Sequence, residues 1–279
     1  MSNNETFQAA VVQAGSVVYD TPATLEKLVQ LTNSAARQGA KLVVFPEAFI
    51  GGYPKGLDFG ARLGTRSDEG RDEFRRYFEG AIEEHGPESD VLSGVARSSK
   101  VYLVVGVIER AGGTLYCSVF FYGPEGQYLG KHRKLMPTAL ERLVWGFGDG
   151  STLPVLDTEL GKLGAVICWE NYMPLARTAL YQKGVSLYLA PNTNDNPEWQ
   201  DTVKHIAIEG RCYVFNVDQY FTKDMYPADL VESGAVAKLN DTACRGGSCI
   251  VDPYGHYVVQ PVWDSEVSGV LAGRPLPWR

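Results

Sequence analysis

The chain has 279 residues, of which 44% are hydrophobic and 21% charged, so it can form a sizeable core and does not belong to the disordered class. Its formal net charge is -7 and its single dense basic cluster is KHRK at 131–134, which argues against a nucleic-acid or polyanion binder. The first ten residues lack signal-peptide segments, and the longest apolar runs are too short for a membrane span. Five cysteines without a disulfide framework favour a reducing compartment, so we expect a soluble cytoplasmic protein.

Strand candidates rich in Val, Ile, Leu and Tyr alternate with helix candidates along the chain. Residues 22–38 place Leu25 and Leu28 on one stripe, with Thr21 as the expected N-cap and Gly39 as the expected stop. The expected strands are 7–13, 41–47, 101–109, 115–123, 163–169, 185–192, 212–219 and 248–253. The remaining expected helices are 71–85, 174–183 and about 197–210.

Several strand candidates are nearly continuous apolar runs, which is typical of strands covered on both faces. The alternation of strands and helices, with hairpin-like pairs at 101–123 and 248–262, predicts a layered α/β fold with a mixed sheet. No linker-like tract or short-period repeat divides the chain. We therefore treat residues 1–279 as one domain, with an atypically short C-terminus after about residue 270.

Polar side chains follow three of the expected strands. Glu47 follows KLVVFP, Cys168 follows LGAVI, and Asn192 follows VSLYLAP. Because ligands of α/β sheets bind at the carboxyl ends of the strands, we expect these residues near a binding site. Pro174 is placed to open a helix just after Cys168, and the backbone N–H groups of that helix would favour a thiolate over a thiol.

A cysteine nucleophile needs a base and a partner for charge. The usual base is a histidine, but none of the four follows a comparable strand: His85, His132, His205 and His256. Glu47 does, and a carboxyl group in an apolar pocket has a raised pKa and exchanges protons near neutrality. Lys134 precedes apolar LMP and is expected to turn inward, although these residues alone do not choose it over Lys131. Such a Glu–Lys–Cys constellation needs no metal.

Three segments carry a resemblance to a known family: FPEAFIGGYPKG, KHRKLMPTALERLVWGFGDGSTLPV and GKLGAVICWENYMPLARTALY. In this order they resemble the signature regions of the nitrilase branch of the carbon–nitrogen hydrolase superfamily, with a likeness that covers about 7–262 and is closest to yeast- and plant-type nitrilases. The resemblance implies a four-layer αββα sandwich. It also implies a catalytic triad of Glu47, Lys134 and Cys168, with Glu141 as an additional active-site glutamate.

The resemblance further implies that the chain hydrolyses an organic nitrile to a carboxylic acid and ammonia, through a thioimidate and a thioester on Cys168. The motif CWE is similar to nitrile-hydrolysing members of the superfamily. The resemblance implies neither a cofactor nor a metal, and it implies that the chain forms a homo-oligomer. We expect five side chains to bind the small-molecule substrate: Tyr53, Trp145, Trp169, Glu170 and Asn192.

Structural alternatives exist for these residues. Cys168 is alternatively a core cysteine, Glu47 a cap of the following turn and Lys134 part of a solvated patch. Glu141 is alternatively half of a surface ion pair, and Asn192 the residue that makes the turn after its strand. The aromatic candidates are as well explained by core packing.

Other functions also compete with a nitrilase. Within the superfamily they are an amidase or carbamoylase and an enzyme that releases the amide. A non-catalytic scaffold is the alternative of a different class, because the strand and tail with which family members usually continue are missing or replaced at the final AGRPLPWR. The hypothesis of a nucleotide-binding module rests on GFGDGS alone, which lacks the spacing of a phosphate loop.

Two further regions carry weaker signals. Cys244 and Cys249, without a nearby histidine, are weak evidence for a metal site. Residues 222–247 are expected to be loop-like.

Overall fold

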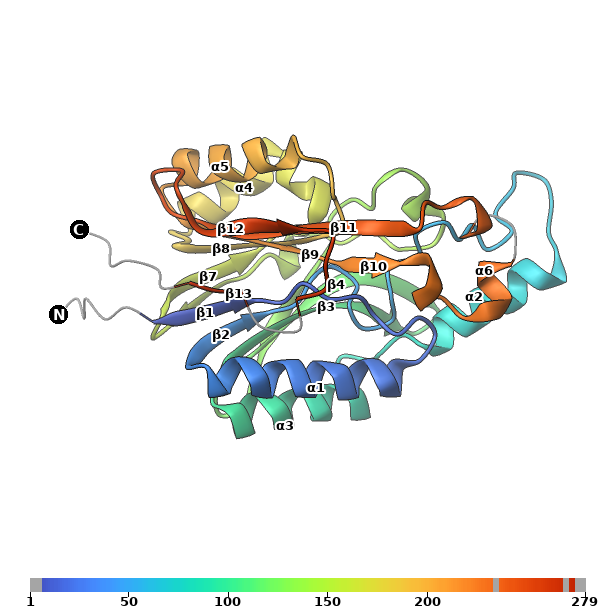
Figure 1. Cartoon of the computed structure of the whole chain (residues 1–279), viewed down its shortest axis with the longest axis horizontal. Helices are drawn as coiled ribbons and strands as arrows, with labels where there is room; N and C mark the ends of the chain where they lie inside the picture. Colours follow the sequence, from blue (N-terminus) through green and yellow to red (C-terminus); the bar gives the residue numbers. More distant parts are fainter. Residues whose placement is uncertain (1–6, 233–235, 268–270, 274–279) are drawn as a thin grey trace.

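The structure is a computed structural model that describes residues 7–232, 236–267 and 271–273. Two β-sheets pack face to face at its centre, and a pair of helices covers the outer face of each sheet (Figure 1). The order of the layers is therefore helix, sheet, sheet, helix. This arrangement confirms the αββα sandwich that the sequence motifs imply.

The first sheet has the strand order β13-β1-β2-β3-β4-β5. Strands β1, β2 and β3 are parallel, whereas β3, β4 and β5 are joined as antiparallel hairpins, which confirms the hairpin expected at 101–123. The bounds are β1 Gln8–Val11, β2 Ala40–Val44, β3 Tyr102–Ala111, β4 Thr114–Tyr122, β5 Tyr128–Arg133 and β13 Leu271–Gly273. Helices α1 (Thr21–Arg37) and α3 (Pro87–Ser99) cover its outer face (Figure 1).

The second sheet has the order β10-β11-β9-β8-β7-β6, and β12 pairs with β11. Strands β7, β8 and β9 are parallel, and β11 and β12 form the expected antiparallel pair. The bounds are β6 Val155–Thr158, β7 Gly161–Ala165, β8 Leu187–Asn192, β9 Tyr213–Asp218, β10 Tyr220–Thr222, β11 Thr242–Val251 and β12 Tyr257–Trp263. Helices α4 (Pro174–Gln182) and α5 (Trp199–Gly210) cover its outer face (Figure 1).

Helix α1 starts with a different N-cap from the one expected, whereas it ends where expected. Asp20, not Thr21, is the N-cap, because the Asp20 side chain accepts a hydrogen bond from the Ala23 backbone N–H. At the other end Gly39 adopts a φ of 91°, a left-handed conformation that ends the helix at little cost for glycine. The chain then enters β2 directly.

Further short elements lie outside the two sheets. The helix expected at 71–85 is α2 (Asp68–Glu79), whereas α3 was not expected. The 3-10 helices η1 (Ala139–Leu143), η2 (Gly150–Thr152) and η3 (Cys168–Tyr172) connect strands near the centre. The region expected to be loop-like, 222–247, also contains η4 (Lys223–Met225), α6 (Ala228–Val231), η5 (Val236–Lys238) and the start of β11.

The hydrophobic core has one layer between the two sheets and one layer under each helix pair. Val44, Val119, Leu189 and Phe215 belong to the layer between the sheets. Each of the five cysteines, all within the described residues, is free and buried. Within these residues no helix has the length and hydropathy that crossing a bilayer requires.

Candidate active site

Glu47 lies in a sharp turn just after β2, and its side chain is fully buried between the sheets. The next residue, Ala48, has a φ of 51°, so the backbone reverses here. Gly106 of β3 lies directly beneath, since a Cβ atom at that position would be 2.0 Å from the Pro46 carbonyl oxygen. The Gln219 side-chain amide donates to the Glu47 carbonyl oxygen at 2.7 Å. These contacts fix the glutamate at the carboxyl end of its strand.

Lys134 follows β5 directly and is buried, which confirms that it turns inward. Its Nζ donates to Glu47 Oε1 at 2.7 Å and to Glu141 Oε2 at 2.8 Å. Burial alone would lower the pKa of Lys134, but Glu47 and the other acidic groups around it raise that pKa well above the usual range. The lysine is therefore an ammonium that two carboxyl groups share. Lys131, on the opposite face of β5, binds Glu84 and Glu109 instead.

The Glu47 carboxyl group has a raised pKa, as expected from its burial. Burial is the largest cause; Lys134 opposes it, and Glu141 adds to it. Its Oε2 accepts a hydrogen bond from Thr193 Oγ1 at 3.1 Å, and the Cys117 thiol donates weakly to Oε1 at 3.6 Å. This carboxyl group is consequently a stronger base than an ordinary exposed carboxylate.

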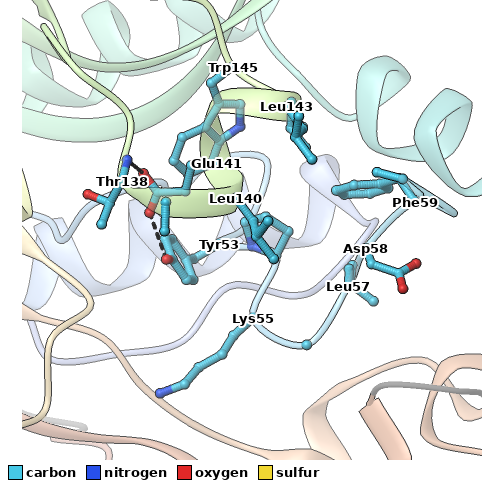
Figure 2. A pocket seen from close by; sticks show the side chains of 15 residues that line it. Tyr53, Lys55, Leu57, Asp58, Phe59, Thr138, Leu140, Glu141, Leu143 and Trp145 are labelled. Carbon is cyan, nitrogen blue, oxygen red and sulfur yellow. Dashed lines mark hydrogen bonds between the residues drawn. The ribbon is translucent and has the colours of Figure 1, made fainter. Parts of the chain in front are cut away.

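Glu141 lies in η1, and its carboxylate is held on both oxygens. Oε1 accepts from the Tyr53 hydroxyl at 2.8 Å, and Oε2 accepts from the Thr138 backbone N–H at 2.6 Å (Figure 2). Oε2 also accepts from Lys134. Because both oxygens are engaged, the side chain has a fixed orientation. The Lys134 ammonium thus links this glutamate to Glu47.

Cys168 begins η3 at the point where the chain leaves β7. Its φ of 51° is a left-handed conformation that non-glycine residues rarely adopt, and such strain is common at functional sites. The Asn171 side-chain amide holds the turn by donating to the Cys168 carbonyl oxygen at 2.7 Å. The thiol therefore projects from a sharp, braced turn.

The expectation that a helix terminus favours a Cys168 thiolate is not met. Burial, followed by the Glu47 carboxylate, raises the pKa of the thiol well above its usual range. Lys134 and a hydrogen bond from the Thr193 backbone oppose this change but do not reverse it. Helix α4 begins only at Pro174, after the whole of η3. The resting group is a thiol that needs a base.

A cavity of about 330 Å³ adjoins this cluster at Glu141 and Tyr53 (Figure 2). Most of its lining is apolar and comes from residues 53–61 and 138–145. Trp145 also belongs to the lining; its ring packs edge-on to Tyr53 and lies 5.5 Å from the Lys134 ammonium. Two of the five expected substrate-binding residues, Tyr53 and Trp145, therefore border the space next to the cluster.

The other three expected substrate-binding residues do not line this cavity. Glu170 is buried, and its carboxylate is bonded to protein groups on both oxygens, so the structure offers no support for the expectation that it contacts substrate. Asn192 makes the turn after β8, since its Oδ1 accepts from the Asn194 N–H at 2.6 Å. Trp169 is 51% exposed and packs edge-on against Tyr172.

Three neighbours of the cluster were missed in the sequence. Thr193 directly follows Asn192, and its hydroxyl binds Glu47. Cys117 lies on β4, where its backbone carbonyl accepts the Lys134 N–H at 2.8 Å. His132 precedes Lys134 by two residues and shares its face of β5, so the two-residue period of a strand was the available signal.

The weaker sequence hypotheses find no structural support. Cys244 and Cys249 lie on β11, and within the described ranges no group of three or more His, Cys, Asp or Glu is placed to hold a metal ion. The GFGDGS segment does not form the strand–loop–helix of a phosphate site, because the Gly148 N–H donates to the Lys134 carbonyl oxygen and η2 follows.

Comparisons with known proteins agree with this architecture. A model described as carbon-nitrogen hydrolase matches residues 8–271. The chain is 52% identical over 268 residues to the bifunctional nitrilase/nitrile hydratase NIT4A of Lupinus angustifolius, with 95% of this chain and 77% of that protein covered. It is 52% identical over 270 residues to Nitrilase 2 of Arabidopsis thaliana, with 95% and 80% covered.

Solved structures share the fold at low sequence identity. Nit3 of Saccharomyces cerevisiae, a member of branch 10 of the nitrilase superfamily, has a TM-score of 0.73 at 21% identity, with 98% of this chain and 91% of that chain covered. An amidase from Nesterenkonia sp. has a TM-score of 0.73 at 20% identity, with 99% and 92% covered. Given the family model and the curated relatives, the chain belongs to the carbon–nitrogen hydrolase family.

Proposed function

We propose that the chain is a nitrilase that hydrolyses an organic nitrile to the carboxylic acid and ammonia. The observation that carries this proposal is the buried cluster of Glu47, Lys134 and Cys168, in a chain about half identical to plant nitrilases. Burial keeps the thiol protonated and gives the Glu47 carboxyl group a raised pKa. A raised pKa makes the Glu47 carboxylate a stronger base towards the thiol proton, which general base catalysis requires.

In the first stage Cys168 attacks the nitrile carbon. Its proton passes by way of Glu47 to the nitrile nitrogen, and a covalent thioimidate results. The Lys134 ammonium stabilises the negative charge that develops on nitrogen, and it is already held in place by Glu47 and Glu141. Because these hydrogen bonds exist before the reaction, little reorganisation is needed in the transition state.

In the second stage one water adds to the thioimidate, and the tetrahedral intermediate expels ammonia to leave a thioester. A second water, deprotonated by Glu47, releases the acid and regenerates the thiol. The sum is one nitrile and two waters converted to one acid and one ammonia, with no redox change and no cofactor. Glu141, locked by Tyr53 and Thr138, keeps Lys134 oriented throughout.

The organic group of the nitrile occupies the adjoining apolar cavity. Tyr53 and Trp145 form its inner end, next to Glu141, and Leu140 and Leu143 belong to its wall (Figure 2). The lining favours an apolar or aromatic substituent. The amide is a second candidate product, because several relatives are named bifunctional nitrilase/nitrile hydratase. It forms if the tetrahedral intermediate expels the thiolate in place of ammonia.

We also propose that the protein is cytoplasmic and forms a homo-oligomer. Five free, buried cysteines fit a reducing compartment. Apolar side chains are exposed on η3 and α4, where Leu175 is 84% and Trp169 51% exposed, and a second copy would cover them.

Ammonia release from a panel of aliphatic, aryl and arylacetic nitriles, beside the matching amides, tests the proposed reaction. We expect ammonia from nitriles by the wild type and none by Cys168→Ala, with mass analysis giving the share of amide. Activity on amides alone would assign the chain to the amidase branch. Folded protein without activity on either class would favour the non-catalytic scaffold.

A further inference from the structure

The buried Glu170 carboxylate accepts three hydrogen bonds from protein groups, although the proposed reaction does not use it. Its Oε1 accepts the Leu135 backbone N–H at 2.6 Å, and its Oε2 accepts the Ile167 backbone N–H at 2.6 Å. Leu135 directly follows Lys134, and Ile167 directly precedes Cys168. One side chain thus connects the backbone beside the ammonium to the backbone beside the thiol.

The third partner of Glu170 is His132, which is also fully buried. His132 Nε2 lies 2.9 Å from Glu170 Oε2, and its Nδ1 lies 2.7 Å from the Thr152 carbonyl oxygen. Both ring nitrogens therefore face acceptors, so both must carry protons for the two hydrogen bonds to form. The ring is an imidazolium, and it compensates the Glu170 charge away from water.

The two connected segments belong to different sheets. Lys134 extends β5 of the first sheet, whereas Cys168 follows β7 of the second sheet. Most side chains packed between the sheets are apolar, and apolar contacts are non-directional, whereas charge-assisted hydrogen bonds to backbone N–H groups have a defined length and direction. A carboxylate bonded to both segments therefore sets their separation more narrowly than packing does.

We propose that Glu170 is a positioning residue, whose carboxylate, neutralised by His132, fixes the Cys168 turn relative to the Lys134 ammonium. It contacts neither substrate nor reacting atoms. Removing one of its bonds leaves the fold intact but lets the thiol and the ammonium shift. Because misplacement of reacting groups by about 1 Å costs about 100-fold in rate, the effect appears in turnover more than in substrate affinity.

The test compares Glu170→Gln with Glu109→Gln. Glu109 is an equally buried carboxylate that binds Lys131 and Arg133 on the opposite face of the same strand, and it touches no segment next to Cys168. An amide at position 170 cannot accept from both backbone N–H groups. For Glu170→Gln we expect kcat to fall about 100-fold with KM within about threefold, and for Glu109→Gln we expect kcat within about twofold of wild type.

A second readout does not depend on the substrate. Alkylation of Cys168 by iodoacetamide, followed by peptide mass analysis, should be about tenfold slower in Glu170→Gln and unchanged in Glu109→Gln, at equal folded fraction by circular dichroism. The kcat measurement rests on the proposed function, whereas the alkylation measurement does not. A wild type inactive on nitriles would therefore defeat the nitrilase assignment while the alkylation rates still decide the role of Glu170.

Should Glu170→Gln fail to fold, His132→Gln replaces it, because this variant keeps both backbone hydrogen bonds of Glu170 and loses the compensating charge. We expect a fall in kcat and in the alkylation rate of about fivefold. Folded Glu170→Gln or His132→Gln with wild-type kcat and alkylation rate would overturn the proposal. Equal losses in Glu170→Gln and Glu109→Gln would overturn it as well, since they would show a structural role only.

Discussion

Two buried carboxyl groups of the first sheet, Glu109 and Glu47, have opposite electrostatic surroundings. Glu109 receives hydrogen bonds from Lys131, Arg133 and Ser118. Burial raises its pKa, but these bonds outweigh burial and the pKa is lowered. Glu109 is therefore firmly ionised, and its hydrogen bonds link β3 to β4 and β5.

Glu47 has one cation, Lys134, and shares it with Glu141. With one positive charge for two carboxyl groups, burial prevails and the pKa of Glu47 is raised. The comparison teaches that burial alone does not make a carboxyl group reactive; the number of cations around it decides. The alternation of β5 produces both cases, since residues 131 and 133 face Glu109 while residues 132 and 134 face the candidate active site.

The largest expected effect comes from removing the single cation of the Glu47 cluster. Lys134→Met leaves two buried carboxyl groups without a positive charge, so we expect kcat to fall about 1000-fold and the free energy of unfolding to fall by about 3 kcal/mol. Lys131→Met leaves Arg133 on Glu109, and kcat should stay within about twofold. Steady-state kinetics give kcat, and urea unfolding gives the free energy of unfolding. Similar kcat losses in Lys134→Met and Lys131→Met would contradict the distinction between the surroundings of Glu47 and Glu109.

An intermediate effect concerns how stability depends on pH. Because the pKa of folded Glu109 is lowered, its ionisation stabilises the fold above the unfolded value of about 4.3 and stops doing so as pH falls through the folded value. We expect Glu109→Gln to melt about 5 °C below wild type at pH 7, with a difference that shrinks as pH falls from about 5 towards 3. Scanning calorimetry across this range checks the sign. A difference that grows in acid would show that Glu109 is not the ionised group.

The smallest expected effect concerns the weak thiol donor to Glu47. A hydroxyl group donates more strongly than the Cys117 thiol, so Cys117→Ser should favour ionised Glu47 and move the acid limb of the kcat/KM profile down by less than about one pH unit. Cys249→Ser is the matched control, because that buried thiol donates to Gln200 instead. An unmoved acid limb in Cys117→Ser, or an equal movement in both variants, would exclude Cys117 as a modulator.

The sequence predicted that Glu47 and Cys168 lie near one site, because each follows an apolar strand and this pattern is local. The apolar runs before Glu47 and Cys168 are β2 and β7, which are parallel strands of the first and the second sheet. Each residue lies just beyond the carboxyl end of its strand, where ligands of α/β sheets bind. The sequence motifs added Lys134 and Glu141, and the structure brings all four together. Their catalytic roles remain a proposal that the activity measurements test.

The remaining features depend on contacts between segments far apart in the chain. In the sequence Glu170 is only a polar residue close to Cys168. The packing of the two sheets shows that its partners include Leu135 and His132. The direction of the Cys168 pKa was wrongly predicted for a similar reason, since the turn and the nearby carboxylates are tertiary features. Helix α3, with Gly94 and several serines, lacks the strong apolar stripe that sequence reading requires.

The division of the cluster between the two sheets also bears on the use of this molecule as a reporter. The part of the chain before β6 supplies Glu47, Lys134 and Glu141, and the part from β6 onwards supplies Cys168 and Thr193. Neither part alone holds both a nucleophile and its base. Two polypeptides separated between these parts would therefore each be inert, and turnover would appear only where they associate. Strand β13 of the second polypeptide would then pair with β1 of the first, which adds antiparallel backbone hydrogen bonds between the fragments.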